Sequence, residues 1–105
     1  MNIQIIGDNF NVSKNTKLLV DEKIGQRLDK LLLKFDPQMH TALIRIQKDK
    51  LDNYLINLDM NLPSKEHIYA EVKHKILESG LIDIQEKVEK QIKKYKAELA
   101  NYSVG

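Results

Sequence analysis

Basic side chains recur at helical spacing in two separate segments of the sequence. The first set follows intervals of 4, 3 and 4 residues and comprises Lys23, Arg27, Lys30 and Lys34. The second set lies near the C-terminal end and comprises Lys87, Lys90, Lys93, Lys94 and Lys96. Rows of flexible ammonium groups bind phosphate backbones as point charges and position a protein on a nucleic acid without reading its bases. The spacing therefore favours shape-driven RNA binding by two helices.

The distribution of charge carries more information than its total. The net charge is only +2, from 17 basic and 15 acidic residues, so composition alone does not indicate a nucleic-acid binder. Residues 87–96, KVEKQIKKYK, nevertheless hold five lysines and one glutamate. If both helices cover one face of a sheet, the first row and the row Lys87, Lys90 and Lys94 are expected to face the same side of the molecule. The alternative is a solvated lysine face that only maintains solubility.

The residue types that usually carry catalysis or bind metals do not form recognisable motifs. The chain has no cysteine, and its four glycines are scattered, so neither a phosphate-binding loop nor a nucleophile elbow is present in the sequence. The three histidines are His40, His67 and His74, and the last two, seven apart in a strand, fall on opposite faces. The acidic residues of the helices, such as Asp83, Glu86 and Glu89, have the spacing of solvated helix charges. We therefore predict no enzymatic activity, no metal site and no cofactor.

Length and hydropathy indicate one small domain. A chain of 105 residues can bury a core of its own without disulfides. The segment MNIQIIGDNF lacks the features of a secretory leader, and no window has the roughly 20 apolar residues of a membrane span. We expect a soluble cytoplasmic protein with a single domain over residues 1–101 and a frayed tail over residues 102–105.

The first third of the sequence predicts a strand and then a helix. Alternation of Ile3 and Ile5 with polar neighbours over residues 2–7 indicates a half-buried strand. Ser13 or Asn15 is the expected N-cap of the helix, which should end at Asp36-Pro37 because proline cannot continue it. The apolar positions recur at intervals of 4, 4, 3 and 4 and comprise Val20, Ile24, Leu28, Leu31 and Phe35.

The remaining sequence predicts three strands and a second helix. Period-2 patterns begin at His40, span 54–62, and run from Ile68 to His74 or Ile76, with turns over 48–53 and at Pro63-Ser64. Helical periodicity resumes near Ser79-Gly80, with apolar positions at Leu81, Ile84, Val88, Ile92, Tyr95 and Leu99. The predicted fold is α+β with the order β-α-β-β-β-α, a four-stranded sheet with both helices packed on one face.

Three segments in this order resemble the short ribosome-hibernation factor family, whose members are also called ribosome-associated inhibitors or sigma-modulation proteins. MNIQIIGDNFNVS resembles the opening strand and Gly-x-Asn turn of the family, and LVDEKIGQRLDKLLLKFD resembles its first helix. The strongest similarity is EKVEKQIKKYK at residues 86–96. Two segments depart from the family pattern: ILESGLIDIQ at the opening of the second helix, and KDKLDN at residues 48–53.

The resemblance implies a double-stranded-RNA-binding-like fold that binds the small ribosomal subunit between head and body. Such a protein would block the messenger and transfer RNA sites in stress or stationary phase, and it is expected to be a monomer when free. The family's basic helix residues map by position onto Lys23, Arg27, Lys30, Lys87, Lys90, Lys93, Lys94 and Lys96.

A second hypothesis is a protein-interaction module of the same fold. Leu43 and Leu55 fall on the nominally polar faces of their strands, where an apolar residue can mark a contact surface. Such a module would use a face or an edge of the sheet.

Overall fold

The computed structural model describes residues 1–36, 38, 40–62 and 66–104, and the side chains of residues 101–104 are not described. The turn predicted at Pro63-Ser64 and the proline of Asp36-Pro37 lie outside these residues. The elements in chain order are β1 (Asn2–Asp8), α1 (Lys14–Val20), the π-helical segment η1 (Asp21–Gly25), α2 (Gln26–Leu31), β2 (Thr41–Lys48), β3 (Tyr54–Leu62), β4 (Glu66–His74) and α3 (Leu77–Val104). The predicted order is confirmed, with the first helix built from three continuous segments.

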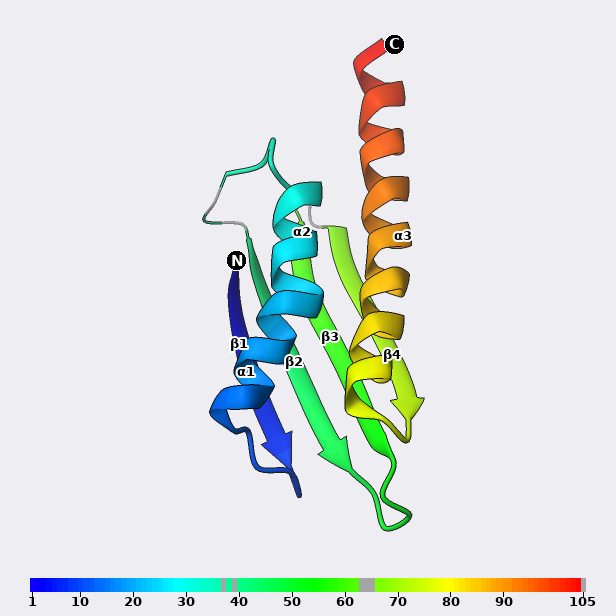
Figure 1. Cartoon of the computed structure of the whole chain (residues 1–105). Helices are drawn as coiled ribbons and strands as arrows, with labels where there is room; N and C mark the ends of the chain where they lie inside the picture. The colour runs from blue at the N-terminus through cyan, green and yellow to red at the C-terminus, as the bar shows by residue number, and fades with distance from the viewer. Residues whose placement is uncertain (37, 39, 63–65, 105) are drawn as a thin grey trace.

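The four strands form one mixed sheet in the order β1-β2-β3-β4. β1 pairs in parallel with β2, whereas β2, β3 and β4 form an antiparallel meander. The helices lie side by side on one face of this sheet and run in the same direction (Figure 1). The apolar faces of the strands therefore point at both helices, and the α+β architecture predicted from the sequence is confirmed.

The first helix buries a different set of positions from the one predicted. Ser13 is its N-cap, and the hydroxyl accepts a hydrogen bond from the Thr16 N–H at 3.1 Å. In η1 the N–H of Gln26 bonds to the carbonyl of Asp21, five residues earlier, so this turn holds one extra residue. The buried positions consequently repeat every four residues as Val20, Ile24, Leu28 and Leu32, and the predicted core residues Leu31 and Phe35 are only half-buried.

The first helix ends at Leu31, well before the predicted stop at Asp36-Pro37. Two side chains from elsewhere in the chain bond to carbonyls at its C-terminal end, where the Leu32 carbonyl also accepts a hydrogen bond from the Phe35 N–H at 2.9 Å. The Lys96 ammonium donates to the Leu31 carbonyl at 3.0 Å, and His40 Nε2 donates to the Leu32 carbonyl at 2.7 Å. Long-range contacts, rather than proline, therefore accompany the end of this helix.

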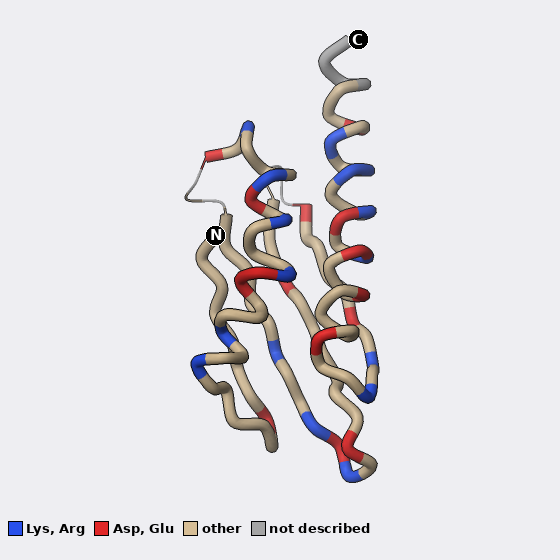
Figure 2. Tube along the Cα trace, in the orientation of Figure 1, with Lys and Arg blue, Asp and Glu red and all other residues tan. Residues whose placement is uncertain are grey.

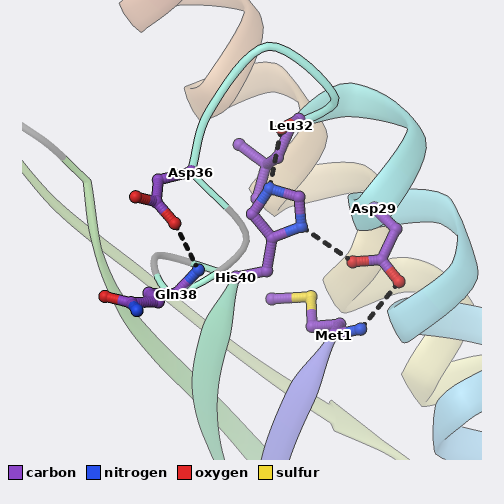
Figure 3. Close-up of polar contacts among 6 residues, drawn as sticks. All are labelled: Met1, Asp29, Leu32, Asp36, Gln38 and His40. Atoms are coloured by element: carbon purple, nitrogen blue, oxygen red, sulfur yellow. Dashed lines mark hydrogen bonds and ion pairs between the residues drawn. The ribbon is translucent and has the colours of Figure 1, made fainter.

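His40 joins three elements at one end of the sheet. Its Nδ1 lies 3.1 Å from Asp29 Oδ1, while the N-terminal ammonium of Met1 lies 2.8 Å from Asp29 Oδ2 (Figure 3). Both ring nitrogens face acceptor oxygens, and only the imidazolium form donates at both. The cluster connects the starts of β1 and β2 to the last turn of α2.

The apolar face of α3 agrees with the sequence prediction. Leu81, Ile84, Val88, Ile92 and Tyr95 are buried, and Leu99 is half-buried. The helix begins at Leu77, slightly before the predicted start near Ser79-Gly80, and β4 stops at His74, which leaves Ile76 exposed in the turn. A Cβ on Gly80 would lie 2.7 Å from Ile56 Cδ1, so this glycine allows the helix to approach β3 closely. The backbone stays helical through Val104, and fraying of residues 102–105 in solution stays a prediction.

Candidate nucleic-acid interface

A groove of about 670 Å³ lies between the first helix and α3 on the outer side of the helical layer. Its lining residues come from η1, α2 and the middle of α3, and they comprise Glu22, Lys23, Gln26, Arg27, Lys30, Ile82, Gln85, Glu86, Glu89, Lys90 and Lys93. Five of these side chains are basic and three are acidic. The two helices therefore form one continuous surface with an excess of positive charge in the groove.

The groove brings together five of the eight basic residues predicted to bind RNA. Lys23, Arg27 and Lys30 line it from the first helix, and Lys90 and Lys93 line it from α3. Lys90 also lines a second hollow on the other flank of α3, so it lies on the outward side of that helix, between the two hollows. For these five residues, the expectation that basic side chains of both helices face the same side of the molecule is consistent with the fold.

Of the row Lys87, Lys90 and Lys94, Lys90 lines the groove, and the other two lie on the β4 flank of α3. The Lys87 ammonium donates to the Glu71 carbonyl of β4 at 3.1 Å, and Lys94 lines a hollow beside Ile68. α3 packs with its apolar stripe rotated so that these two lysines lie over β4. Lys93 occupies the groove-facing flank instead.

Lys96, which was also predicted to bind RNA, contacts the first helix. Its side chain is half-buried, and its ammonium bonds to the Leu31 carbonyl on the first helix. Carbonyl groups at a helix C-terminus carry a partial negative charge, which makes them a favourable partner for lysine. Lys96 therefore connects the two helices near the end of the groove.

Several groove cations are paired with acidic residues. Lys23 Nζ lies 3.4 Å from Glu78 and 3.7 Å from Glu22, and Arg27 Nε lies 3.2 Å from Glu89. In the described part of the chain, Lys30, Lys34 and Lys90 make no ion pair. Figure 2 shows most acidic residues of α3 nearer its start and the lysines farther along the helix, and Glu98 follows the lysines in sequence. Positive charge therefore accumulates where α2 ends.

Gln85 is a groove residue that the sequence analysis did not identify. Only 6% of its surface is exposed, and its Nε2 atom has no hydrogen-bond partner among the described residues. The sequence contains one weak signal, which is a polar residue beside the apolar positions Leu81, Ile84 and Val88. Periodicity alone cannot show that such a residue turns toward a second helix.

The opposite face of the sheet is polar apart from a few side chains. Leu43 and Leu55, which motivated the interaction-module hypothesis, are half-buried. His67 Nε2 lies 2.8 Å from Asp59 Oδ1 on this face.

At the β4 edge of the sheet, the Gln91 amide from α3 donates to the Tyr69 carbonyl at 2.7 Å and accepts from the Tyr69 N–H at 3.4 Å. Side chains of α3 thus occupy backbone groups that an added strand would need.

Nowhere in the described ranges do three or more His, Cys, Asp or Glu side chains gather closely enough to hold a metal ion. No helix of the described part is both long and apolar enough to cross a membrane.

Residues 3–100 match the sequence model of the family described as sigma 54 modulation protein / S30EA ribosomal protein. The fold is similar to the crystal structure of the Thermus thermophilus Protein Y N-terminal domain, with a TM-score of 0.75 and 20% sequence identity. The similarity covers 90% of this chain and 99% of that chain. No curated protein matches the sequence at a significant level.

Proposed function

The chain belongs to the sigma 54 modulation protein / S30EA ribosomal protein family, and from this premise we propose that it is a ribosome hibernation factor. It binds the small ribosomal subunit in the cytoplasm, between head and body, and stops translation in stress or stationary phase. The binding surface is the outer side of the helical layer.

The groove between the helices is the observation that supports this proposal most directly. It gathers Lys23, Arg27, Lys30, Lys90 and Lys93 on one surface although they come from opposite ends of the sequence. Ammonium and guanidinium groups along a groove can contact successive phosphates of folded RNA. Because such contacts do not read bases, the protein would recognise the shape of ribosomal RNA.

Occlusion is the proposed mechanism of inhibition. A domain that occupies the channel between head and body physically excludes messenger and transfer RNA, so no chemical step is needed. Lys87 and Lys94, on the flank over β4, extend the positive surface beyond the groove, while Lys96 supports it by holding α2 against α3. Neither a cofactor nor a small-molecule substrate takes part.

The free protein is proposed to be a monomer. An added strand at the β4 edge would have to displace Gln91 from Tyr69 and Lys87 from the Glu71 carbonyl. Blocking of an edge strand by side chains is a common protection against edge-to-edge association. Light scattering after size exclusion should therefore give the monomer mass, whereas a salt-independent dimer would favour the interaction-module hypothesis.

Co-sedimentation with ribosomes and isolated subunits, at low and moderate salt, tests the proposed function. We expect pelleting with the small subunit that weakens as salt rises, and inhibition of in vitro translation at the same protein concentrations. The interaction should involve several phosphates, each adding roughly 0.7–0.9 to the slope of log affinity against log salt. Failure to pellet at low salt would contradict the proposal.

A further inference from the structure

The buried amide of Gln85 needs a partner that the described part of the chain does not supply. Its Nε2 atom is covered and has no hydrogen-bond partner among the described residues, although the residue lines the groove between the first helix and α3. Buried polar groups in native proteins are nearly always hydrogen-bonded, and an exception calls for a water or a ligand. A group that carries hydrogen-bond acceptors and enters the groove would satisfy this amide.

The neighbours of Gln85 indicate the chemistry of that group. Ile82 contributes an apolar surface that is 38% exposed, and Arg27 contributes a planar guanidinium. Unstacked RNA bases pack against such surfaces while their edges hydrogen-bond to side chains. Lys30 and Lys90 line the same groove and make no ion pair in the described part of the chain, so they are available to phosphates.

We propose that the groove binds one unstacked nucleotide of RNA, with the edge of its base hydrogen-bonded to the Gln85 amide. This inference rests on the proposed function, because it assumes that the helical layer faces RNA. It goes beyond that function because lysine contacts to phosphates recognise only the shape of the RNA. The proposed hydrogen bond to Gln85 would add a contact to a base. The volume of about 670 Å³ falls within the range of roughly 300–1,000 Å³ that is usual for small-ligand pockets.

Access to Gln85 requires the side chains that line the groove to move. Two ion pairs connect the first helix to α3, namely Lys23 with Glu78 and Arg27 with Glu89. Phosphates compete with these carboxylates for the same cations, so their arrival would release the contacts and admit the base. Contact with the base is therefore expected only together with contact to phosphates.

The experiment compares two RNA hairpins that have the same number of phosphates and are identical except at one position. One carries a single-nucleotide bulge, and the other carries an abasic ribose at that position. The wild-type chain should bind the bulged hairpin about tenfold more tightly, the size of effect expected for one good contact to a base. Gln85→Leu should bind both hairpins with the affinity that the wild type shows for the abasic one, whereas Gln47→Leu, on the opposite sheet face, should keep the preference.

Gln85→Leu should fold normally because it replaces an unpaired amide by an apolar group of similar size, which circular dichroism can verify. The side-chain amide signals of Gln85 in NMR spectra provide a readout on the unmodified chain, and they should shift with the bulged hairpin. Equal wild-type affinities for the two hairpins would overturn the inference, as would a preference that survives Gln85→Leu. A shift with a glutamate-rich peptide but not with RNA would also overturn it.

These outcomes are distinct from failure of the proposed function. Salt-sensitive pelleting with the small subunit, combined with no preference for the bulged nucleotide, would remove only the nucleotide site. Absence of pelleting and of hairpin binding would remove both proposals.

Discussion

Arg27 on the first helix and Glu89 on α3 are 62 residues apart in sequence, yet the Nε atom of Arg27 lies 3.2 Å from Oε1 of Glu89. The second carboxylate oxygen of Glu89 lies 4.0 Å from Lys93 Nζ. The Glu89 side chain is only 16% exposed, and its carboxylate partly neutralises two of the five cations that line the groove. An RNA phosphate must compete with Glu89 for these two side chains.

Glu89→Gln should strengthen binding to the small subunit by a few-fold. Removal of the carboxylate leaves Arg27 and Lys93 free to contact phosphates, and each new contact steepens the salt slope by roughly 0.7–0.9. Salt-dependent pelleting measures both quantities. The matched control is Glu98→Gln, which removes the same charge from an exposed position of the same helix. Equal affinities of the two variants would show that Glu89 does not compete with the ligand.

The triple variant Lys30→Ala, Lys90→Ala and Lys93→Ala should bind the small subunit more weakly and with a flatter salt dependence. Loss of three phosphate contacts should reduce the slope by about 2–3. The triple variant Lys14→Ala, Lys50→Ala and Lys75→Ala removes the same charge at exposed positions outside the groove. If both triple variants lose the same affinity, only net charge matters and the groove is not the binding surface.

Lys96→Met should lower the free energy of unfolding by about 1–2 kcal/mol, because it removes a charged hydrogen-bond donor from a half-buried carbonyl. Methionine keeps the apolar stem, so the loss reports mainly the bond to the Leu31 carbonyl at 3.0 Å. Urea unfolding measures the change. Lys94→Met, at an exposed position of the same helix, should stay within about 0.5 kcal/mol of the wild type. A similar effect of both substitutions would contradict the structural role of Lys96.

Asp29 should make stability depend on pH in the acid range. Burial raises the pKa of Asp29, but the hydrogen bonds and charges of the N-terminal ammonium and His40 outweigh it, so this pKa lies below its ordinary value of 3.8. A lowered pKa in the folded state means that the carboxylate stabilises the fold above pH 3.8 and that this contribution disappears as pH falls through the folded-state pKa.

Urea unfolding of Asp29→Asn between pH 6 and pH 3 tests this prediction on a chain whose first residue is Met1. The variant should be less stable than the wild type at pH 6, and the difference should shrink as the pH falls below the ordinary pKa of a carboxyl group, about 4. Glu86→Gln, at an exposed position, serves as the control. A difference that stays constant across the range would show that the Asp29 charge does not contribute.

Gln91→Ala should open the β4 edge of the sheet. The substitution removes both bonds between the Gln91 side chain and the Tyr69 backbone, which should lower the free energy of unfolding by about 1 kcal/mol. The Tyr69 amide should then exchange with solvent faster than in the wild type. Gln47→Ala, on the exposed side of β2, should leave this exchange unchanged. Unchanged exchange in Gln91→Ala would mean that the contact does not protect the edge.

The periodicity of the sequence determined the elements and their order. Strands with one buried face repeat apolar residues every second position, and helices repeat them every three or four, so both patterns can be read locally. The apolar face of α3 was correct from Leu81 to Tyr95 for this reason. The π-helical turn at Asp21–Gly25 was not predicted. Its extra residue leaves the buried positions before it unchanged and alters only those that follow, so that Leu32 is buried in place of Leu31.

The sequence also determined that lysines and arginines lie on both helices, but only the tertiary structure decided which of them meet. The rotation of α3 on the sheet places Lys93 in the groove and Lys87 over β4, a choice set by packing against strands and a helix far away in sequence. The partners of Arg27 and Lys96 lie 62 and 65 residues away, and the buried position of Gln85 depends on the neighbouring helix. Such contacts arise from the packing of whole elements, and a local pattern of residues does not encode them.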